Sequence, residues 1–124
     1  ITPRVELVVV DTITSLYRAE LGSSKETFAL NRELNRQVAS LAQVAKARKV
    51  AVLMSSQVRS ILEQLSIEPV ATRVLKFWSD VVVNLRHTAQ TRVVKAVLEK
   101  HPRRKRPTSC FFLIEQTGVR GYGR

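Results

Sequence analysis

The sequence predicts an α/β fold in which a parallel βαβ unit is followed by an antiparallel meander at one edge of the sheet. An unbroken apolar run at residues 5–10, closed by Asp11, is typical of a parallel strand buried on both faces. Apolar residues then recur at helical spacing over residues 26–48, which predicts a long amphipathic helix. A second apolar run at residues 50–54 predicts the next strand. Because a long crossover joins parallel neighbours, these two strands should be parallel.

The second half of the chain is predicted to begin with a loop and a short helix. Residues 56–69 have no clear period and are interpreted as a mobile loop, and residues 70–78 as a helix. Three strands separated by polar turns follow, at residues 80–86, 92–99 and 110–115. Such short links favour antiparallel pairing. The whole chain, residues 1–124, is therefore treated as one domain.

Composition favours a protein of the cytoplasm. No apolar stretch is long enough to cross a membrane, no signal peptide is recognisable, and the single Cys110 suits a reducing compartment. Cys110 and Trp78 are predicted to be core residues, in preference to a nucleophile and a base-stacking ring. His87 and His101 have no partners at metal-ligand spacing, so metal binding through them is not expected. Since a strand begins almost at Ile1, which is not Met, we expect a fragment of a longer protein.

The charge of the chain is its first functional signal. The net charge is +11, and it is uneven: residues 1–58 carry 8 basic and 5 acidic side chains, whereas residues 59–124 carry 13 and 5. Such an excess attracts polyanions, because neutralised phosphates release counterions. One basic run, bracketed by two prolines, could grip backbone phosphates: Arg103, Arg104, Lys105 and Arg106. The alternatives are ordinary solubility charge or a thermophile's preference for Lys and Arg, and, for the run itself, a solvated turn.

Asp11 is the first candidate for chemistry. Four apolar residues followed by an aspartate at the carboxyl end of a strand form the Walker B pattern. The strand fixes the carboxylate at the sheet edge, where it can hold the Mg²⁺ that bridges nucleotide phosphates. A buried strand that ends in a capping or turn aspartate would give the same pattern, so Asp11 alone leaves both interpretations open.

The longer pattern around Asp11 resembles a known family. Residues 5–20, Val-Glu-Leu-Val-Val-Val-Asp-Thr-Ile-Thr-Ser-Leu-Tyr-Arg-Ala-Glu, are similar to the Walker B segment of the RadA and RadB recombinases, which are RecA-type ATPases. Later segments resemble the remaining strands of that family in the right order, at residues 50–58, 68–71, 80–86, 92–101 and 110–119. The chain is closer to the RadB branch, because little chain follows Val119. The resemblance implies the C-terminal half of a RecA-like P-loop NTPase core.

The resemblance also implies roles for individual residues. Asp11 would hold Mg²⁺ with ATP, Gln57 would sense the γ-phosphate at the base of a DNA-binding loop, and Pro69 would lie at the nucleotide. Ser56 stands where family members commonly have Asn, which is a departure from the pattern. A DNA-facing surface is implied at Arg59, Arg73 and Lys76, beside the basic run at Arg103, Arg104, Lys105 and Arg106.

The sequence lacks the phosphate-binding loop of the family. No Gly-x-x-x-x-Gly-Lys-Ser/Thr is present, and the four glycines are predicted to lie in turns or at the C-terminus. This chain alone should therefore not hydrolyse ATP, although its parent is implied to be a weak DNA-dependent ATPase. The implied function is ATP-dependent DNA binding in homologous recombination and repair at the nucleoid, with DNA and a RadA-type recombinase or further copies as partners. The alternatives are a non-catalytic module that docks on a recombinase, and a related ATPase with a signalling role.

Overall fold

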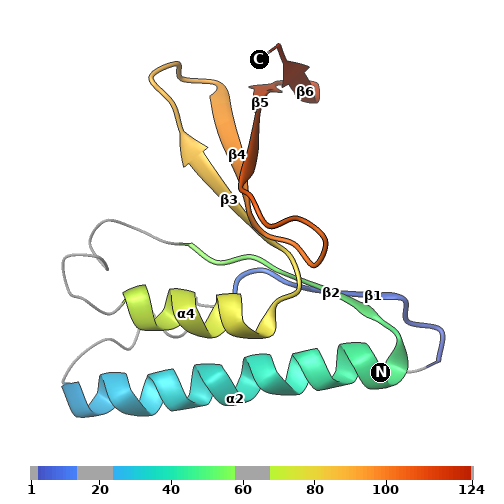
Figure 1. Cartoon of the computed structure of the whole chain (residues 1–124), viewed down its shortest axis with the longest axis vertical. Coiled ribbons are helices and arrows are strands. Elements are labelled where there is room, and N and C mark those ends of the chain that lie inside the picture. Colours follow the sequence, from blue (N-terminus) through green and yellow to red (C-terminus); the bar gives the residue numbers. More distant parts are fainter. Residues whose placement is uncertain (1–2, 14–23, 58–67, 124) are drawn as a thin grey trace. The chain divides into compact units, whose positions relative to one another are not determined.

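The chain forms two compact units in a computed structural model, Ile1–Trp78 and Ser79–Arg124, and each is described by itself (Figure 1). The structure describes residues 3–13, 24–57 and 68–123, without the side chains of residues 24–28 and 68–71. A two-stranded parallel sheet lies in the first unit and a four-stranded antiparallel sheet in the second. Among the described residues, no helix is long and apolar enough to cross a membrane.

The first unit contains the predicted βαβ arrangement. Its elements are β1 (Leu7–Val10), α2 (Ser24–Arg48), β2 (Ala51–Met54) and α4 (Glu68–Trp78). The two strands pair in parallel, from Leu7 opposite Ala51 to Val10 opposite Met54. Most of the segment predicted to be a loop, residues 58–67, lies outside the described residues. The last two residues predicted to lie in the loop, Glu68 and Pro69, instead form the first turn of α4. Proline is tolerated there because the amides of the first turn have no hydrogen-bond partner within the helix.

The end of α2 has a defined cap that sets the entry into β2. Lys49 follows the helix with a φ of 54°, in the left-handed region. The amide of Val50 donates a hydrogen bond of 3.1 Å to the carbonyl of Ala45, and the Val50 side chain is buried. This combination is a Schellman motif, in which a residue in the left-handed conformation closes the helix. The next strand can therefore start immediately, at Ala51.

We expect Lys49→Gly to stabilise the protein by about 0.5–1 kcal/mol, because a side chain at a φ of 54° is strained and glycine is not. Thermal or urea unfolding followed by circular dichroism would measure the gain. Lys46→Gly, three residues earlier inside α2, is the matched control and should destabilise by about 1 kcal/mol. Equal effects of the two changes would contradict the role of Lys49 as the cap.

The core of the first unit lies between its helices and one face of its sheet. Leu34 and Val38 of α2 are buried. Partly buried apolar residues of α2, β2, α4 and the segment after β1 pack against them: Ile13, Leu30, Met54, Val74, Leu75 and Trp78. The indole Nε1 of Trp78 donates a 2.9 Å hydrogen bond to Oδ1 of Asn35. Trp78 is thus partly buried against the core, on the side where the sequence predicted it, and its indole N–H has a partner.

The other face of this sheet is open, which corrects the expectation of burial on both faces. Leu7, Val9 and Leu53 are 55%, 57% and 59% exposed, whereas the alternate residues are half-buried. Figure 1 shows the reason, since α2 and α4 lie on the same side of β1 and β2. The apolar run correctly predicted two apolar faces, but the described residues cover only one of them.

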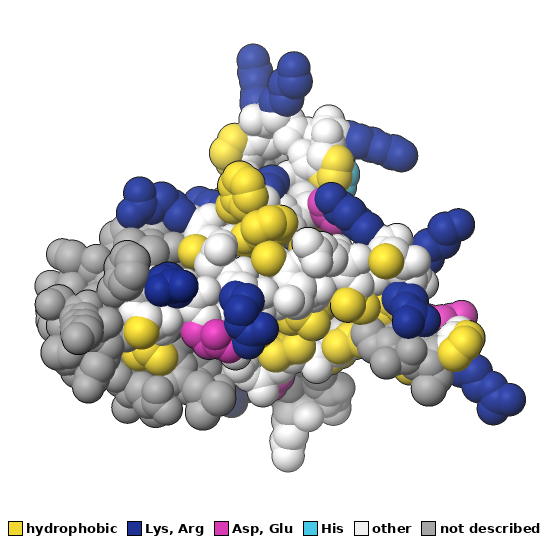
Figure 2. All heavy atoms as spheres, turned by 90° about the horizontal axis from the view of Figure 1, so that it is seen from below, with side chains coloured by type: hydrophobic (Ala, Val, Ile, Leu, Met, Phe, Trp, Pro, Cys, Tyr) yellow, Lys and Arg dark blue, Asp and Glu magenta, His cyan; other side chains and the backbone are white. Residues whose placement is uncertain are grey.

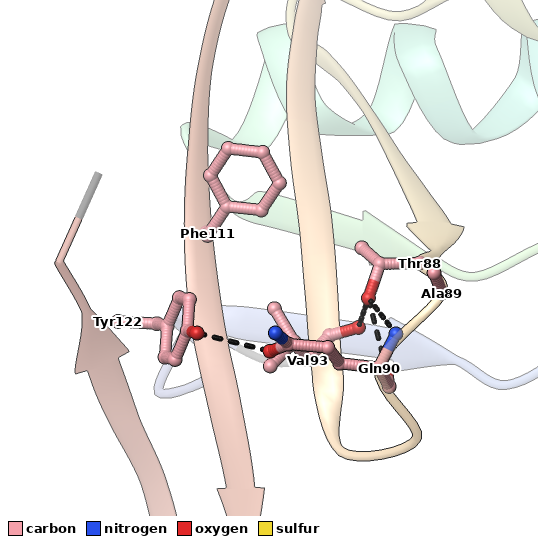
Figure 3. Close-up of a pocket in the computed structure, with 6 residues that line it drawn as sticks. All are labelled: Thr88, Ala89, Gln90, Val93, Phe111 and Tyr122. Atoms are coloured by element: carbon pink, nitrogen blue, oxygen red, sulfur yellow. Dashed lines mark hydrogen bonds between the residues drawn. The ribbon is translucent and has the colours of Figure 1, made fainter.

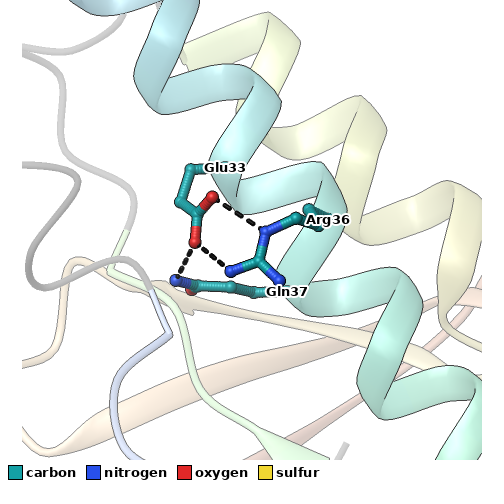
Figure 4. A network of polar contacts seen from close by, with 3 residues as sticks. All are labelled: Glu33, Arg36 and Gln37. Carbon is teal, nitrogen blue, oxygen red and sulfur yellow. Dashed lines mark hydrogen bonds and ion pairs between the residues drawn. The ribbon is translucent and has the colours of Figure 1, made fainter.

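The solvent face of α2 carries a compact polar cluster (Figure 4). Arg36 donates to both carboxylate oxygens of Glu33, with a distance of 2.9 Å from its Nε, and Gln37 donates at 3.0 Å. Hydrogen bonds from Arg36 and then Gln37 lower the pKa of Glu33 to about 2. These contacts at spacings of three and four residues support the helix only modestly, because the cluster is exposed to solvent.

The second unit is an antiparallel meander, as predicted, but it has one strand more than expected. In the described residues it forms a sheet of its own and does not extend the edge of the sheet of β1 and β2. It comprises β3 (Val82–His87), β4 (Val93–Lys100), β5 (Thr108–Glu115) and β6 (Gly118–Tyr122), in that order across the sheet. Strand β6 was not predicted from the sequence. Gly118 and Gly121, which were predicted to lie in turns or at the C-terminus, are both part of this strand.

Gly118 explains how β6 can begin directly after β5. Its φ of 134° lies in a region that glycine adopts readily, and it pairs with Glu115 across the turn at residues 116–117. Cys110 is exposed on β5, so its predicted place in the core is wrong. Its partner in the ladder is Ala96. The sheet face that they share is not covered by the second unit, as the exposure of Leu85 on the same face shows.

Candidate functional site

The carboxyl ends of β1 and β2 bring a carboxylate and a hydroxyl together. Val10 and Met54 form the last pair of the parallel ladder, so Asp11 and Ser55 leave the sheet at the same edge. Oγ of Ser55 donates a 2.7 Å hydrogen bond to Oδ1 of Asp11. The main chain fixes the pair further, because Ser55 N donates to the Val10 carbonyl at 3.0 Å and Ile13 N donates to the Ser55 carbonyl at 2.9 Å.

This arrangement suits a cation shared with a ligand. Asp11 is exposed, and the bond from Ser55 orients its carboxylate through Oδ1. In the described parts of the chain, no three His, Cys, Asp or Glu side chains gather as a metal site. Mg²⁺ in nucleotide sites commonly takes one or two carboxylates and completes its shell with phosphates and water. The residues present therefore fit a magnesium ion bound together with a nucleotide.

Asp11 was predicted as a site residue from the sequence, and Ser55 was not. The detectable signal was positional, since both residues directly follow apolar runs that were predicted to be parallel neighbours. The exact register between β1 and β2, which decides that Asp11 faces Ser55, could not be obtained from the two runs.

The other residues predicted to bind nucleotide or DNA lie in the segment after Ser55, on α4, or outside the described residues. Gln57 is exposed, two residues beyond Ser55. Pro69 lies in the first turn of α4, and its side chain is not described. Arg59 lies outside the described residues. Arg73 and Lys76 are exposed and lie about one turn apart on α4, so they share one side of that helix.

The basic run forms an exposed turn between β4 and β5. His101, the residue after β4, holds the backbone of this turn: the His101 carbonyl accepts from Arg104 N at 3.3 Å, and His101 Nδ1 accepts from Arg103 N at 3.1 Å. The Arg104 side chain extends toward Oγ1 of Thr108 at 3.4 Å. The turn thus presents four cationic side chains to solvent from a fixed backbone, and no sequence signal identified His101 as its anchor.

The cationic character extends over the whole second unit. Residues 79–124 contain 10 Lys and Arg against 3 Asp and Glu, a net charge of +7. Figure 2 shows one face of the molecule, on which Lys and Arg side chains recur while Asp and Glu are few. Two of the three acidic residues are already paired, Glu99 with Arg86 at 3.7 Å and Glu115 with Arg120 at 2.6 Å. The remaining field is positive and suits a polyanion.

Comparison with known proteins identifies the family. The family model described as Rad51 matches residues 1–122. The chain belongs to the Rad51 family. Within this family it is similar to the DNA repair and recombination protein RadB of Methanococcus maripaludis strain C5, with 37% identity over 114 residues that cover 91% of the chain and 51% of the relative. RadB of Methanocaldococcus jannaschii is 39% identical over 102 residues, covering 82% of the chain and 46% of the relative.

A solved structure agrees with these relatives. The chain is similar to the crystal structure of the RadB recombinase, with a TM-score of 0.69 and 26% identity, over 99% of the chain and 54% of that structure. The predicted RecA-like α/β fold and the resemblance to RadB are thereby confirmed. The chain spans about half the length of the curated relatives it matches.

Proposed function

We propose that this Rad51-family chain is the part of a RadB-like protein that joins nucleotide binding to DNA binding in homologous recombination and repair. The observation that carries the proposal is the Asp11–Ser55 pair at the carboxyl edge of the parallel strands. Ligands of α/β sheets bind at this edge. The family and the fold give the pair its interpretation as the magnesium-holding end of a nucleotide site.

On the nucleotide side, each residue has a proposed role. Bound Mg²⁺ and ATP would supply the charge neutralisation that phosphoryl transfer needs. Asp11 would hold the ion, and Ser55 would orient the Asp11 carboxylate. Gln57 would contact the γ-phosphate and Pro69 would border the nucleotide, so that the segment carrying Arg59 would respond to the nucleotide state.

On the DNA side, the proposal rests on exposed cations. Arg73 and Lys76 on α4 and the four residues of the basic turn would contact backbone phosphates, which gives affinity without sequence preference. Single-stranded or double-stranded DNA is the proposed ligand, and a RadA-type recombinase or further copies of the chain are the proposed protein partners.

The 124-residue chain should show no ATP turnover above background, because its sequence contains no phosphate-binding loop. A coupled assay of phosphate release, with and without DNA, would measure this. Turnover that disappears in Asp11→Ala would contradict the expectation, since it would require a phosphate cradle within this chain.

The proposed role of Asp11 in holding Mg²⁺ can be tested in a fusion protein, in which the amino-terminal half of the M. maripaludis relative precedes this chain. A fluorescent ATP analogue is titrated into this fusion protein. Asp11→Asn should weaken Mg²⁺-dependent binding at least about tenfold, and Ser55→Ala, which removes only the orienting hydrogen bond, should weaken it less. Binding measured in EDTA should be equal in all three proteins. Unchanged magnesium dependence in Asp11→Asn would refute the assignment.

A further inference from the structure

A row of cationic and aromatic side chains crosses the four-stranded sheet. Arg86 on β3 pairs with Lys95 on β4, Lys95 pairs with Phe111 on β5, and Phe111 pairs with Tyr122 on β6. Residues directly opposite one another in a ladder point to the same face. One sheet face therefore presents two cations followed by two aromatic rings.

A small cleft lies at the aromatic end of this row (Figure 3). Its volume is about 210 Å³, and it is lined by residues of the β3–β4 turn and of β4, β5 and β6: Thr88, Ala89, Gln90, Val93, Phe111 and Tyr122. Val93 is only 6% exposed, whereas Tyr122 is 38% exposed. The cleft is smaller than the roughly 300 Å³ at which pockets for drug-sized ligands begin, so it suits a single flat ring system.

Hydrogen bonds hold the polar groups of the cleft in place, and among the described residues one of these groups still has hydrogen-bond donors without an acceptor. Tyr122 Oη donates a 2.9 Å hydrogen bond to Oε1 of Gln90. Thr88 Oγ1 fixes the turn: the carbonyls of Gln90 and Val93, at 3.0 and 2.8 Å, share its one hydroxyl hydrogen, and it accepts from Gln90 N at 3.2 Å. In the described structure, Nε2 of Gln90 makes no hydrogen bond and keeps two donors available.

The ammonium group of Lys95 lies beside the aromatic end of this row. Nζ of Lys95 lies 6.0 Å from the centroid of the Phe111 ring. Among the described residues, no carboxylate lies within ion-pair distance of Lys95, whereas Arg86 and Arg120 are both paired with glutamates. Lys95 can therefore serve a phosphate next to a ring bound in the cleft.

The opposite face of the four-stranded sheet is apolar and differs in character from the face with the cleft. Alternation along the strands places Val83, Leu85, Ile114 and Val119 on that face, with 53%, 62%, 48% and 69% exposure. A continuous apolar face is the one that other protein would cover. The face that carries Lys95, Phe111 and Tyr122 also carries the ion pairs of Arg86 with Glu99 and of Arg120 with Glu115, and both guanidinium groups on it are exposed.

We propose that this cleft binds one unpaired base of a single-stranded nucleic acid. The ring of Tyr122 stacks on the base, the Gln90 amide donates to an acceptor on the base edge, and Lys95 neutralises an adjacent phosphate. Aromatic stacking next to a cation is the general means of holding single strands. The proposal rests on the DNA binding proposed above and adds to it a contact that reads bases, separate from the basic turn.

The test compares an oligothymidylate with an abasic oligomer of equal length, using fluorescence anisotropy on the full 124-residue chain. Both ligands present the same phosphates, so their difference reports base contacts. Tyr122→Leu should weaken oligothymidylate binding about tenfold and leave abasic binding unchanged. Tyr122→Phe, which keeps the ring and loses only the bond to Gln90, should stay near wild type. Lys95→Met should weaken both ligands alike.

The remaining outcomes of the binding experiment distinguish the base cleft from DNA binding in general. Equal wild-type affinity for the two oligomers overturns the base cleft and leaves DNA binding intact, whereas binding of neither oligomer overturns the proposed function as well. Equal weakening of both ligands by Tyr122→Leu means that the ring is only structural. Should Tyr122→Leu not fold, photocrosslinking of wild-type chain to an oligomer containing 5-iodouracil decides: a crosslink at Phe111 or Tyr122 supports the cleft, and crosslinks only elsewhere overturn it.

Discussion

Replacing Arg103, Arg104, Lys105 and Arg106 together by Ala should weaken DNA binding about a hundredfold near 0.1 M salt. All four residues are exposed in the turn between β4 and β5, on a backbone that His101 holds in place. Each phosphate contact adds about 0.9 to the slope of log affinity against log salt concentration, so the slope should fall by about 3 to 4. Fluorescence anisotropy at several salt concentrations measures both quantities.

A matched variant separates a local contact from the effect of total charge. Arg4, Arg32, Lys46 and Arg48 are also exposed and lie in the first unit, and their joint replacement by Ala removes the same four charges. This control should change the slope by less than about 1, because long-range attraction between exposed charges is screened beyond about 10 Å. Equal losses in the two variants would mean that the basic turn is only a solvated part of a cationic protein.

The sequence was sufficient to predict the helix and strands whose apolar residues follow a clear repeat or run. Helix α2 repeats its apolar residues over 25 positions, and its predicted end at Arg48 is the observed one. The pair β1 and β2 was predicted because two apolar runs flank that helix, and their parallel pairing follows from its length.

Where prediction failed, the deciding interaction was not local. β6 contains Gly118, Arg120 and Gly121, which do not resemble a strand, and its pairing with β5 alone makes it one. Cys110 was predicted to be a core residue because its neighbours in the strand are apolar, but it is exposed. The composition of a strand does not determine whether another element packs on either of its faces. The contact between Asp11 and Ser55 depends on register, which two short apolar runs leave open.

Each of the two sheets in the described residues has one exposed apolar face, and this exposure has a thermodynamic consequence. Leu53 of β2 is 59% exposed, and Leu34 of α2 is 3% exposed, in the same unit. The free energy lost on truncating a leucine depends on the apolar surface that it buries and on the cavity left behind. The two leucines therefore form a matched pair with the same chemistry and opposite burial.

Leu34→Ala should lower the free energy of unfolding by about 2–5 kcal/mol, because it opens a cavity beside Val38 in the packed layer between α2 and α4. Leu53→Ala should lower it by less than about 1 kcal/mol, since its side chain meets mainly solvent. Urea unfolding of the 124-residue chain at low concentration, followed by circular dichroism, gives both values. A large loss in Leu53→Ala would show that the open face of β1 and β2 is covered in solution. If that loss grew with protein concentration, the cover would be a second copy of the chain, because only association depends on concentration.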